Sequence, residues 1–242
     1  PHRSAGCVDN GRVRVPASRG TPPAGIPMAE RKRPRRTRER ILETSLALFN
    51  QSGAPRVTTA DIADELNISP GNLYYHFRNK DEIVFELYEA YEARVLPLYA
   101  DPAGRHLDVD DLWLWLHLLF ERLREYRFLY RALDELSSRE RKLGTRMGAL
   151  LRKGAATVIE LCCGMVKAGT MRASAREIEA LADNVLLVAT YWSAYDRIRR
   201  APHDDAPRAD AGRAAYQVLA LFGPYFNGDA RAHLDRLSAD YL

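Results

Sequence analysis

Hydrogen-bonding and aromatic side chains are concentrated in one short segment, SPGNLYYHF (residues 69–77). If this segment is helical, Leu73 and Phe77 are four residues apart and face inward. The side chains that are then free to point outward are Gly71, Asn72, Tyr74, Tyr75 and His76. Two exposed tyrosines beside an amide and an imidazole are unusual on a solvated face. They suit a nucleic-acid groove, where amides and hydroxyls read base edges or hold phosphates.

The flanking residues predict the two helices that would position this face. Thr58 or Thr59 can cap a first helix, with Asp61 three residues after Thr58 as in a capping box. Ser69 reads as the cap of a second helix with Pro70 at its first position, where the missing N–H costs nothing. The first N–H groups of that second helix can also hold a phosphate. The inward face of the first helix carries Ile62, Ala63 and Leu66.

The segment ADIADELNISPGNLYYHFRNKDEI (residues 60–83) resembles the DNA-binding domain of the TetR family of bacterial regulators. The resemblance extends from Arg35 to about Tyr91. The residues that carry it are Gly71, Leu73, Tyr74, His76, Phe77 and Lys80. It implies an all-α fold with a three-helix DNA-binding head, which contains a helix-turn-helix, and a larger all-helical ligand-binding and dimerisation body.

By this resemblance, Asn72, Tyr74 and Tyr75 would approach bases. The family often has Thr or Ser where Asn72 stands, and asparagine can make a bidentate pair with adenine. The full set of expected DNA-binding residues is Thr59, Ser69, Pro70, Gly71, Asn72, Tyr74, Tyr75, His76 and Lys80, of which Ser69, His76, Lys80 and Thr59 would hold phosphates. The alternative is a helical hairpin without a nucleic-acid partner, in which a tyrosine packs against the body.

Charge is unevenly distributed along the chain. Residues 1–40 hold 11 Arg and Lys against three Asp and Glu, a net charge of +8, whereas the whole chain of 242 residues carries +4. The basic cluster in front of the helix-turn-helix comprises Arg31, Lys32, Arg33, Arg35, Arg36, Arg38 and Arg40. Such a cluster gives salt-dependent affinity for phosphates, although a solvated tail is the alternative for its first members.

The first 27 residues are rich in Gly, Pro and Arg and lack apolar periodicity, so we expect residues 1–30 to be a disordered extension. Met28 begins a sequence that reads like a natural start, which suggests a cloning scar or an over-extended start site before it. The chain shows no secretory signal core and no membrane-length apolar run. Three cysteines do not form a disulfide framework, and the chain reads as cytoplasmic.

Apolar periodicity predicts helices throughout. The head would occupy residues 31–80, with a first helix from Thr37 to about Gln51. A fourth helix from Asp81 would join the head to a body spanning residues 81–242. Pro97 and the stretch 101–104 would mark the end of this helix. The expected body helices are 108–125, 127–137, 139–168, 175–200, 211–226 and a short tail helix after Asp229.

Two body helices carry more apolar surface than one core needs. In 175–200 one stripe contains Ile178, Val185 and Trp192, and a second contains Leu187, Tyr191 and Ile198. The helix 211–226 carries one apolar face, composed of Ala215, Val218, Leu219, Phe222 and Phe226. The resemblance implies a homodimer through these two helices, and a two-fold dimer requires a palindromic operator. A single large core is the alternative.

A small-molecule effector would bind in the body. Its candidate contacts are aromatic or polarisable: Trp113, Leu116, His117, Phe120, Met165, Tyr191, Trp192 and Tyr195. Residues of these types at helical spacing are more often plain core than part of a ligand site. His117 and Glu121 are four apart but are a weak metal pair, and no cofactor or metal site is predicted.

These features together predict a DNA-binding transcriptional regulator, a homodimeric repressor released from its operator by a small-molecule effector. The alternatives are an architectural or ligand-independent DNA-binding protein and an all-helical enzyme. The enzyme is disfavoured because the six histidines are scattered and there is no Gly-rich phosphate loop or nucleophile elbow.

Overall fold

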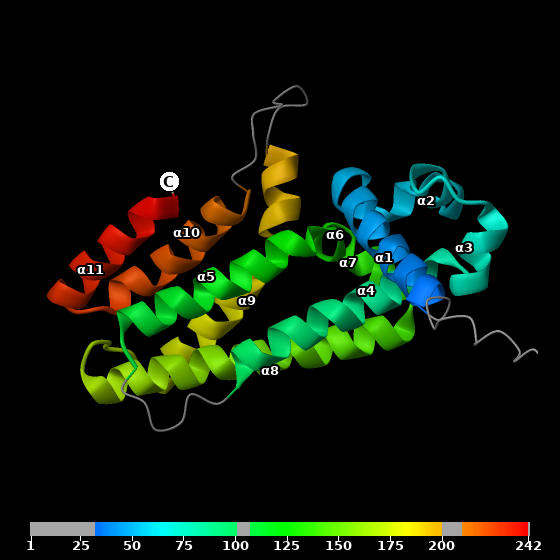
Figure 1. The fold of residues 1–242 in the computed structure, drawn as a ribbon. Helices are drawn as coiled ribbons and strands as arrows, with labels where there is room; N and C mark the ends of the chain where they lie inside the picture. Colours follow the sequence, from blue (N-terminus) through cyan, green and yellow to red (C-terminus); the bar gives the residue numbers. More distant parts are fainter. Residues whose placement is uncertain (1–31, 101–106, 200–209, 242) are drawn as a thin grey trace, which may run out of the picture.

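The computed structural model describes residues 32–100, 107–199 and 210–241, and within these ranges the regular structure is helical. Figure 1 shows an elongated molecule with the helices of residues 32–76 (α1 to α3) at one end and the long helices α4 (Lys80–Val95), α5 (Val109–Glu125) and α8 (Arg141–Ala168) running away from them. The last two α-helices, α10 and α11, lie beside α5 at the far end. The predicted extension before residue 31, and the predicted break at 101–104, fall outside the described residues.

The head contains three α-helices and a short turn between the first two. The elements are α1 (Lys32–Ser52), the 3-10 turn η1 (Ala54–Arg56), α2 (Thr59–Glu65) and α3 (Pro70–His76). Thr58 caps α2 in a capping box with Asp61, and Ser69 caps α3 with Pro70 at its first position. These caps confirm the local prediction from the sequence, because both depend on residues no more than three apart.

The turn between α2 and α3 contains the one non-glycine residue with positive φ among the described residues, Asn67 at 53°. Asparagine tolerates this left-handed conformation better than most residues because its short polar side chain can bond locally. The turn brings the Ile68 N–H to the Ala63 carbonyl at 3.0 Å, and the first helix therefore ends before Ser69.

Helix α4 (Lys80–Val95) leads from the head along the body (Figure 1). Helix α4 has a buried face along its length. Ile83, Val84 and Leu87 are buried in its first half, and Tyr88 and Tyr91 are buried further along. On the body side Arg146 of α8 binds Glu89 and Glu92, and Arg139 of α7 binds Asp81 at 3.2 Å. These ion pairs fix α4, and with it the end of the head, to the body.

The body consists of seven further α-helices within the described residues. They are α5 (Val109–Glu125), α6 (Arg127–Arg131), α7 (Leu133–Arg139), α8 (Arg141–Ala168), α9 (Ala175–Arg199), α10 (Asp210–Phe222) and α11 (Gly228–Ser238), with the 3-10 turns η2 (Leu96–Tyr99), η3 (Gly223–Tyr225) and η4 (Ala239–Tyr241). None of the described helices is both long and apolar enough to cross a bilayer. The expected helix 127–137 is divided at Ala132, whose φ of −133° and ψ of 28° are not helical.

The apolar stripe of α10 has a different role from the one expected. Ala215, Val218, Leu219 and Phe222 have no exposed surface, and Phe226 beyond the helix is nearly as buried. They pack inside the chain, where α10 lies against α5 and α9. The apolar surplus of this helix is therefore used within one subunit and gives no support to a dimer contact.

Candidate nucleic-acid interface

Helix α3 presents polar and aromatic side chains outward from two buried anchors. Leu73 and Phe77 are buried in the head, as the four-residue spacing predicted. Tyr74 and Tyr75 are 53% and 78% exposed, which is unusual for side chains of this size. Gly71 and Asn72 are also exposed, so the structure places the expected base-reading residues on one accessible surface.

A hydrogen bond connects the two helices of the helix-turn-helix at this surface. The hydroxyls of Thr59 and Tyr74 lie 3.0 Å apart, although the residues are 15 positions apart in sequence. This contact fixes the Tyr74 ring relative to the start of α2. A phosphate oxygen at the start of α2 would meet the Thr59 hydroxyl and the N-terminal end of that helix.

The start of α3 is ordered by its own cap. Ser69 Oγ accepts a hydrogen bond from the Asn72 N–H at 3.2 Å, which sets the backbone of the exposed residues Pro70 and Gly71. At the other end of the helix the His76 ring meets the Tyr75 ring edge to face at 5.1 Å. His76 is partly buried, so its imidazole is less available than the two tyrosines.

Lys80 has partners inside the protein. Its Nζ donates to the carbonyl oxygens of Ala54 at 2.8 Å and Val57 at 2.9 Å, with Pro55 at 3.5 Å. Burial among these groups lowers the pKa of the Lys80 ammonium. The resemblance implied a phosphate contact for Lys80. That contact stays a prediction, and the bonds of the ammonium to these carbonyls do not favour it.

The basic cluster of α1 divides into bound and exposed members. Arg38 forms a two-pronged ion pair with Glu86 of α4, and its guanidinium lies 4.6 Å from the centre of the Phe77 ring. Arg36 and Arg40 are exposed and can approach a DNA backbone. The side chains of residues 31–35 lie outside the described part of the chain.

The expected effector contacts occupy three different environments in the body. Leu116, Phe120 and Met165 are core residues with at most 4% exposure. Tyr191 and Tyr195 are exposed on α9, and the Trp192 ring packs against that of Tyr195 with 5.6 Å between centres. The structure therefore does not gather all eight candidates at one place.

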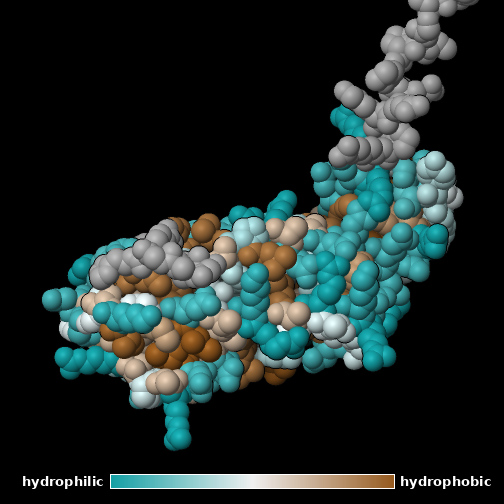
Figure 2. All heavy atoms as spheres, turned by 90° about the horizontal axis from the view of Figure 1, so that it is seen from below, coloured by the Kyte–Doolittle hydropathy of each residue, from teal (hydrophilic) through white to brown (hydrophobic). Residues whose placement is uncertain are grey.

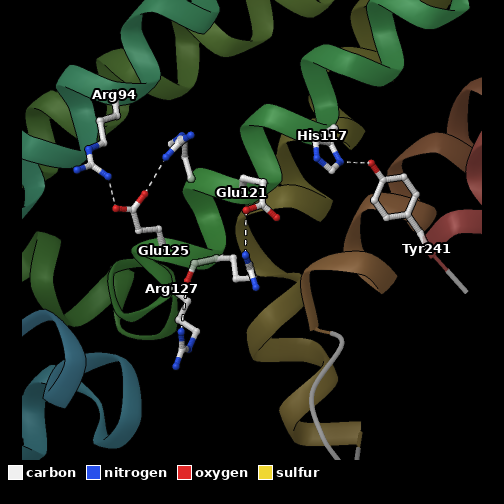
Figure 3. A network of polar contacts seen from close by, with 8 residues as sticks. Arg94, His117, Glu121, Glu125, Arg127 and Tyr241 are labelled. Carbon is white, nitrogen blue, oxygen red and sulfur yellow. Dashed lines mark hydrogen bonds and ion pairs between the residues drawn. The ribbon is translucent and has the colours of Figure 1, made fainter.

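The remaining two candidates, Trp113 and His117, stack on each other with 5.2 Å between ring centres. His117 Nδ1 lies 2.8 Å from the Tyr241 hydroxyl, and Figure 3 shows this contact beside the separate ion pair of Glu121. That ion pair joins Glu121 to Arg124 at 2.9 Å. The His117 and Glu121 side chains thus have different partners. Within the described residues no group of three or more potential metal-binding side chains was found.

Both parts of the chain match models of one protein family. Residues 41–87 match the model described as "Bacterial regulatory proteins, tetR family", and residues 90–234 match the one described as "Bacterial transcriptional repressor". The boundary between the two matches falls within α4.

The chain is also similar to proteins of known structure or curated function. A TetR-family transcriptional regulator from Marinobacter aquaeolei VT8 is 33% identical with a TM-score of 0.76, covering 85% of this chain and 98% of that one. SmeT, solved in complex with triclosan, shares the fold at 22% identity and a TM-score of 0.53 over 81% of this chain and 94% of its own.

A curated relative, the probable acrEF/envCD operon repressor of Escherichia coli K12, is 34% identical over 91 residues. That alignment spans 37% of each of the two chains, little more than a third of the relative's length. The family-model matches cover more than half of the chain, and the Marinobacter structure is matched over nearly its whole length. The chain belongs to the TetR family, whose members are DNA-binding regulators and not enzymes.

Proposed function

We propose that this protein is a homodimeric transcriptional repressor that binds a palindromic operator through α3 and is released by a small-molecule effector. The observation that carries the proposal is the exposed face of α3, where Asn72, Tyr74 and Tyr75 project from the buried Leu73 and Phe77. Asn72 supplies an amide for a base edge, and the two tyrosines supply hydroxyls and ring faces.

The dimer is supported by an apolar stripe on α9 that is largely exposed in the described chain. Leu187, Tyr191, Tyr195 and Ile198 repeat at helical spacing and are all exposed. Monomeric proteins seldom leave such a continuous apolar stripe in water. We propose that α9 forms the centre of the interface and that α10 contributes only its exposed side, at Arg213 and Gln217.

An effector that binds the body is supported by two buried indole donors. Within the described residues, the Nε1 atoms of Trp113 and Trp192 are buried and have no hydrogen-bond acceptor. A buried donor without an acceptor is costly, so a ligand with an acceptor atom and an apolar ring would stabilise either position. SmeT, which shares the fold, binds an aromatic compound of this kind, triclosan.

Selection from a pool of random-sequence duplexes tests the proposal directly. The full chain is mixed with the pool, and the bound DNA is recovered and sequenced. We expect an inverted repeat whose half-sites lie about one helical turn apart or slightly more. Recovered DNA without a repeated motif would identify an architectural binder. A metabolite library added to the operator complex should then contain compounds that release the DNA.

Asn72→Ala and Tyr74→Ala should each lower the affinity for the selected operator by about 10- to 100-fold, since a good side-chain pair with a base contributes about 1–3 kcal/mol. Binding to a random duplex should change much less, because that binding depends on phosphate contacts. Fluorescence anisotropy with the two duplexes measures the ratio of the affinity for the operator to the affinity for the random duplex. Gln51→Ala, which removes an exposed amide elsewhere in the head, is the control. Equal losses on both duplexes would contradict a base-reading role.

A further inference from the structure

Lys80 is the first residue of α4, yet its side chain reaches back to the turn that precedes α2. Its ammonium donates to the Ala54 carbonyl at 2.8 Å and the Val57 carbonyl at 2.9 Å. Ala54 and Val57 are buried, so these carbonyls depend on partners inside the protein. The lysine thus supplies hydrogen bonds to an irregular stretch of backbone that no helix or sheet would otherwise satisfy.

The bond from Lys80 to Val57 closes the helix-turn-helix into a ring. Val57 is the residue immediately before the Thr58 cap of α2, and Lys80 follows the end of α3 by four positions. Both helices, α2 and α3, and the turn at Asn67 therefore lie between the two bonded residues, which are 23 positions apart. Closing this segment reduces the conformational freedom of α2, which carries Thr59, and of α3, which carries Tyr74.

The surroundings of Lys80 do not suit a DNA phosphate. A lysine ammonium has three N–H donors. The carbonyls of Ala54 and Val57 take two of them, and the Pro55 carbonyl, at 3.5 Å, is placed for the third. Besides the burial that lowers its pKa, the charges that act on the ammonium are of both signs: Arg139 lowers the pKa further, and the carboxylates of Asp81, Glu135 and Asp61 raise it. A phosphate brought to this point would have to displace one of these carbonyls from the ammonium.

We propose that Lys80 is a positioning residue that closes the helix-turn-helix by binding the carbonyls of Ala54 and Val57, and that it does so in the free protein and in the DNA complex alike. The consequence for DNA recognition rests on the proposed contacts of α3. The closure itself does not, because it can be measured without DNA.

The test compares Lys80→Met with Arg78→Gln in the full chain. Both variants remove one positive charge close to the end of α3, but Arg78 is exposed and only its backbone N–H takes part in a local bond, to Glu82. Hydrogen exchange read by mass spectrometry should show the amides of α2 and α3 exchanging about 10-fold faster or more in Lys80→Met, because buried carbonyls lose their donor. Peptides from α8 should exchange as before, and Arg78→Gln should match the unaltered protein throughout.

Salt dependence separates the closure from a phosphate contact. The logarithm of affinity for a random-sequence 30-base-pair duplex is plotted against the logarithm of salt concentration for the unaltered protein and Lys80→Met. The slope should be the same for both, whereas loss of one phosphate contact would reduce it by about 0.9. Unchanged exchange in α2 and α3, or a slope reduction of that size, would overturn the proposal.

A measurement on the unaltered protein covers the case in which Lys80→Met does not fold. Acetylation by an N-hydroxysuccinimide ester is followed at Lys80 and at the exposed Lys153 of α8. A lysine bound to carbonyls should react about 10-fold more slowly than Lys153, with or without the duplex, because its amine is partly buried and hydrogen bonded. A Lys80 amine that reacts as fast as Lys153 without DNA and is protected only by the duplex would overturn the proposal.

Discussion

Replacing Leu187 and Ile198 together with aspartate should convert the protein from dimers to monomers. These side chains are 57% and 81% exposed on α9, where they lie three helical turns apart on one stripe. Burying each contributes about 1.5–3 kcal/mol, and two-fold symmetry uses each side chain twice. The dimer dissociation constant should therefore rise by about a thousandfold or more. Sedimentation velocity across a dilution series measures this change.

The same substitution should lower operator affinity, because a monomer reaches only one half-site. Losing the second half-site removes an advantage of about 10²- to 10⁴-fold. Leu114→Asp is the matched control, since Leu114 is a leucine of similar exposure, 49%, on α5. This control should remain dimeric and bind the operator as before. A double variant that is still dimeric at nanomolar concentration would place the interface elsewhere.

The parts of this architecture that depend on near neighbours could be predicted from sequence. Thr58 and Ser69 were identified as caps because a cap and its target amide are three positions apart. The buried Leu73 and Phe77 were identified from a four-residue spacing, and the outward tyrosines followed from them. Helical periodicity likewise indicated the two stripes of α9. In each case the determining contact lies within one or two turns of the same helix.

Contacts between distant residues could not be predicted in this way. The partners of Lys80 lie 23 to 26 positions away, and a lysine in a basic head is equally consistent with a phosphate contact. The stripe of α10 looked like surplus because periodicity shows that a face is buried but not what covers it. In the structure α5 and α9 cover it. The difference between core and interface is decided by tertiary packing.

One such distant contact joins the head to the corner between α5 and α6. Asn50, in the last turn of α1, donates from Nδ2 to the Glu125 carbonyl at 2.8 Å and accepts from the Phe128 N–H at 3.1 Å. Arg131 donates to the Asn50 carbonyl at 2.8 Å, and the Phe49 and Phe128 rings lie 5.3 Å apart. The Asn50 amide thus replaces the helical hydrogen bonds that are interrupted at this corner.

Helix α6 also contacts two other elements of the body. Tyr130 shares a buried hydrogen bond with Tyr91 of α4, and burial raises the pKa of both hydroxyls, so they remain protonated. On another side α6 packs against α9, the helix of the proposed dimer interface. Figure 2 shows a largely hydrophilic head beside a body with exposed apolar groups. A shift of α6 would therefore reach α1 through Asn50.

Asn50→Ala should lower the free energy of unfolding by about 2–4 kcal/mol. The substitution leaves the Phe128 N–H and the Glu125 carbonyl without their partner, and each unsatisfied buried group costs about 1–3 kcal/mol. Asn50 is 8% exposed and Phe128 is fully buried, so water cannot easily replace the amide. The lost hydrogen bonds join the head to the body, so we expect the head to unfold at a lower temperature than the body. Differential scanning calorimetry of the full chain should show two transitions in place of one.

Gln51→Ala is the matched control for this prediction, because it removes a similar amide from the next, exposed position of the same helix. The free energy of unfolding of Gln51→Ala should stay within about 0.5 kcal/mol of that of the unaltered protein. Urea unfolding followed by tryptophan fluorescence reports the body alone, since all three tryptophans lie in α5 and α9. If the body and the head still unfold together in Asn50→Ala, with a loss no larger than that of the control, then Asn50 does not hold the head to α6. The connection between head and body would then rest on α4 and its ion pairs with Arg146.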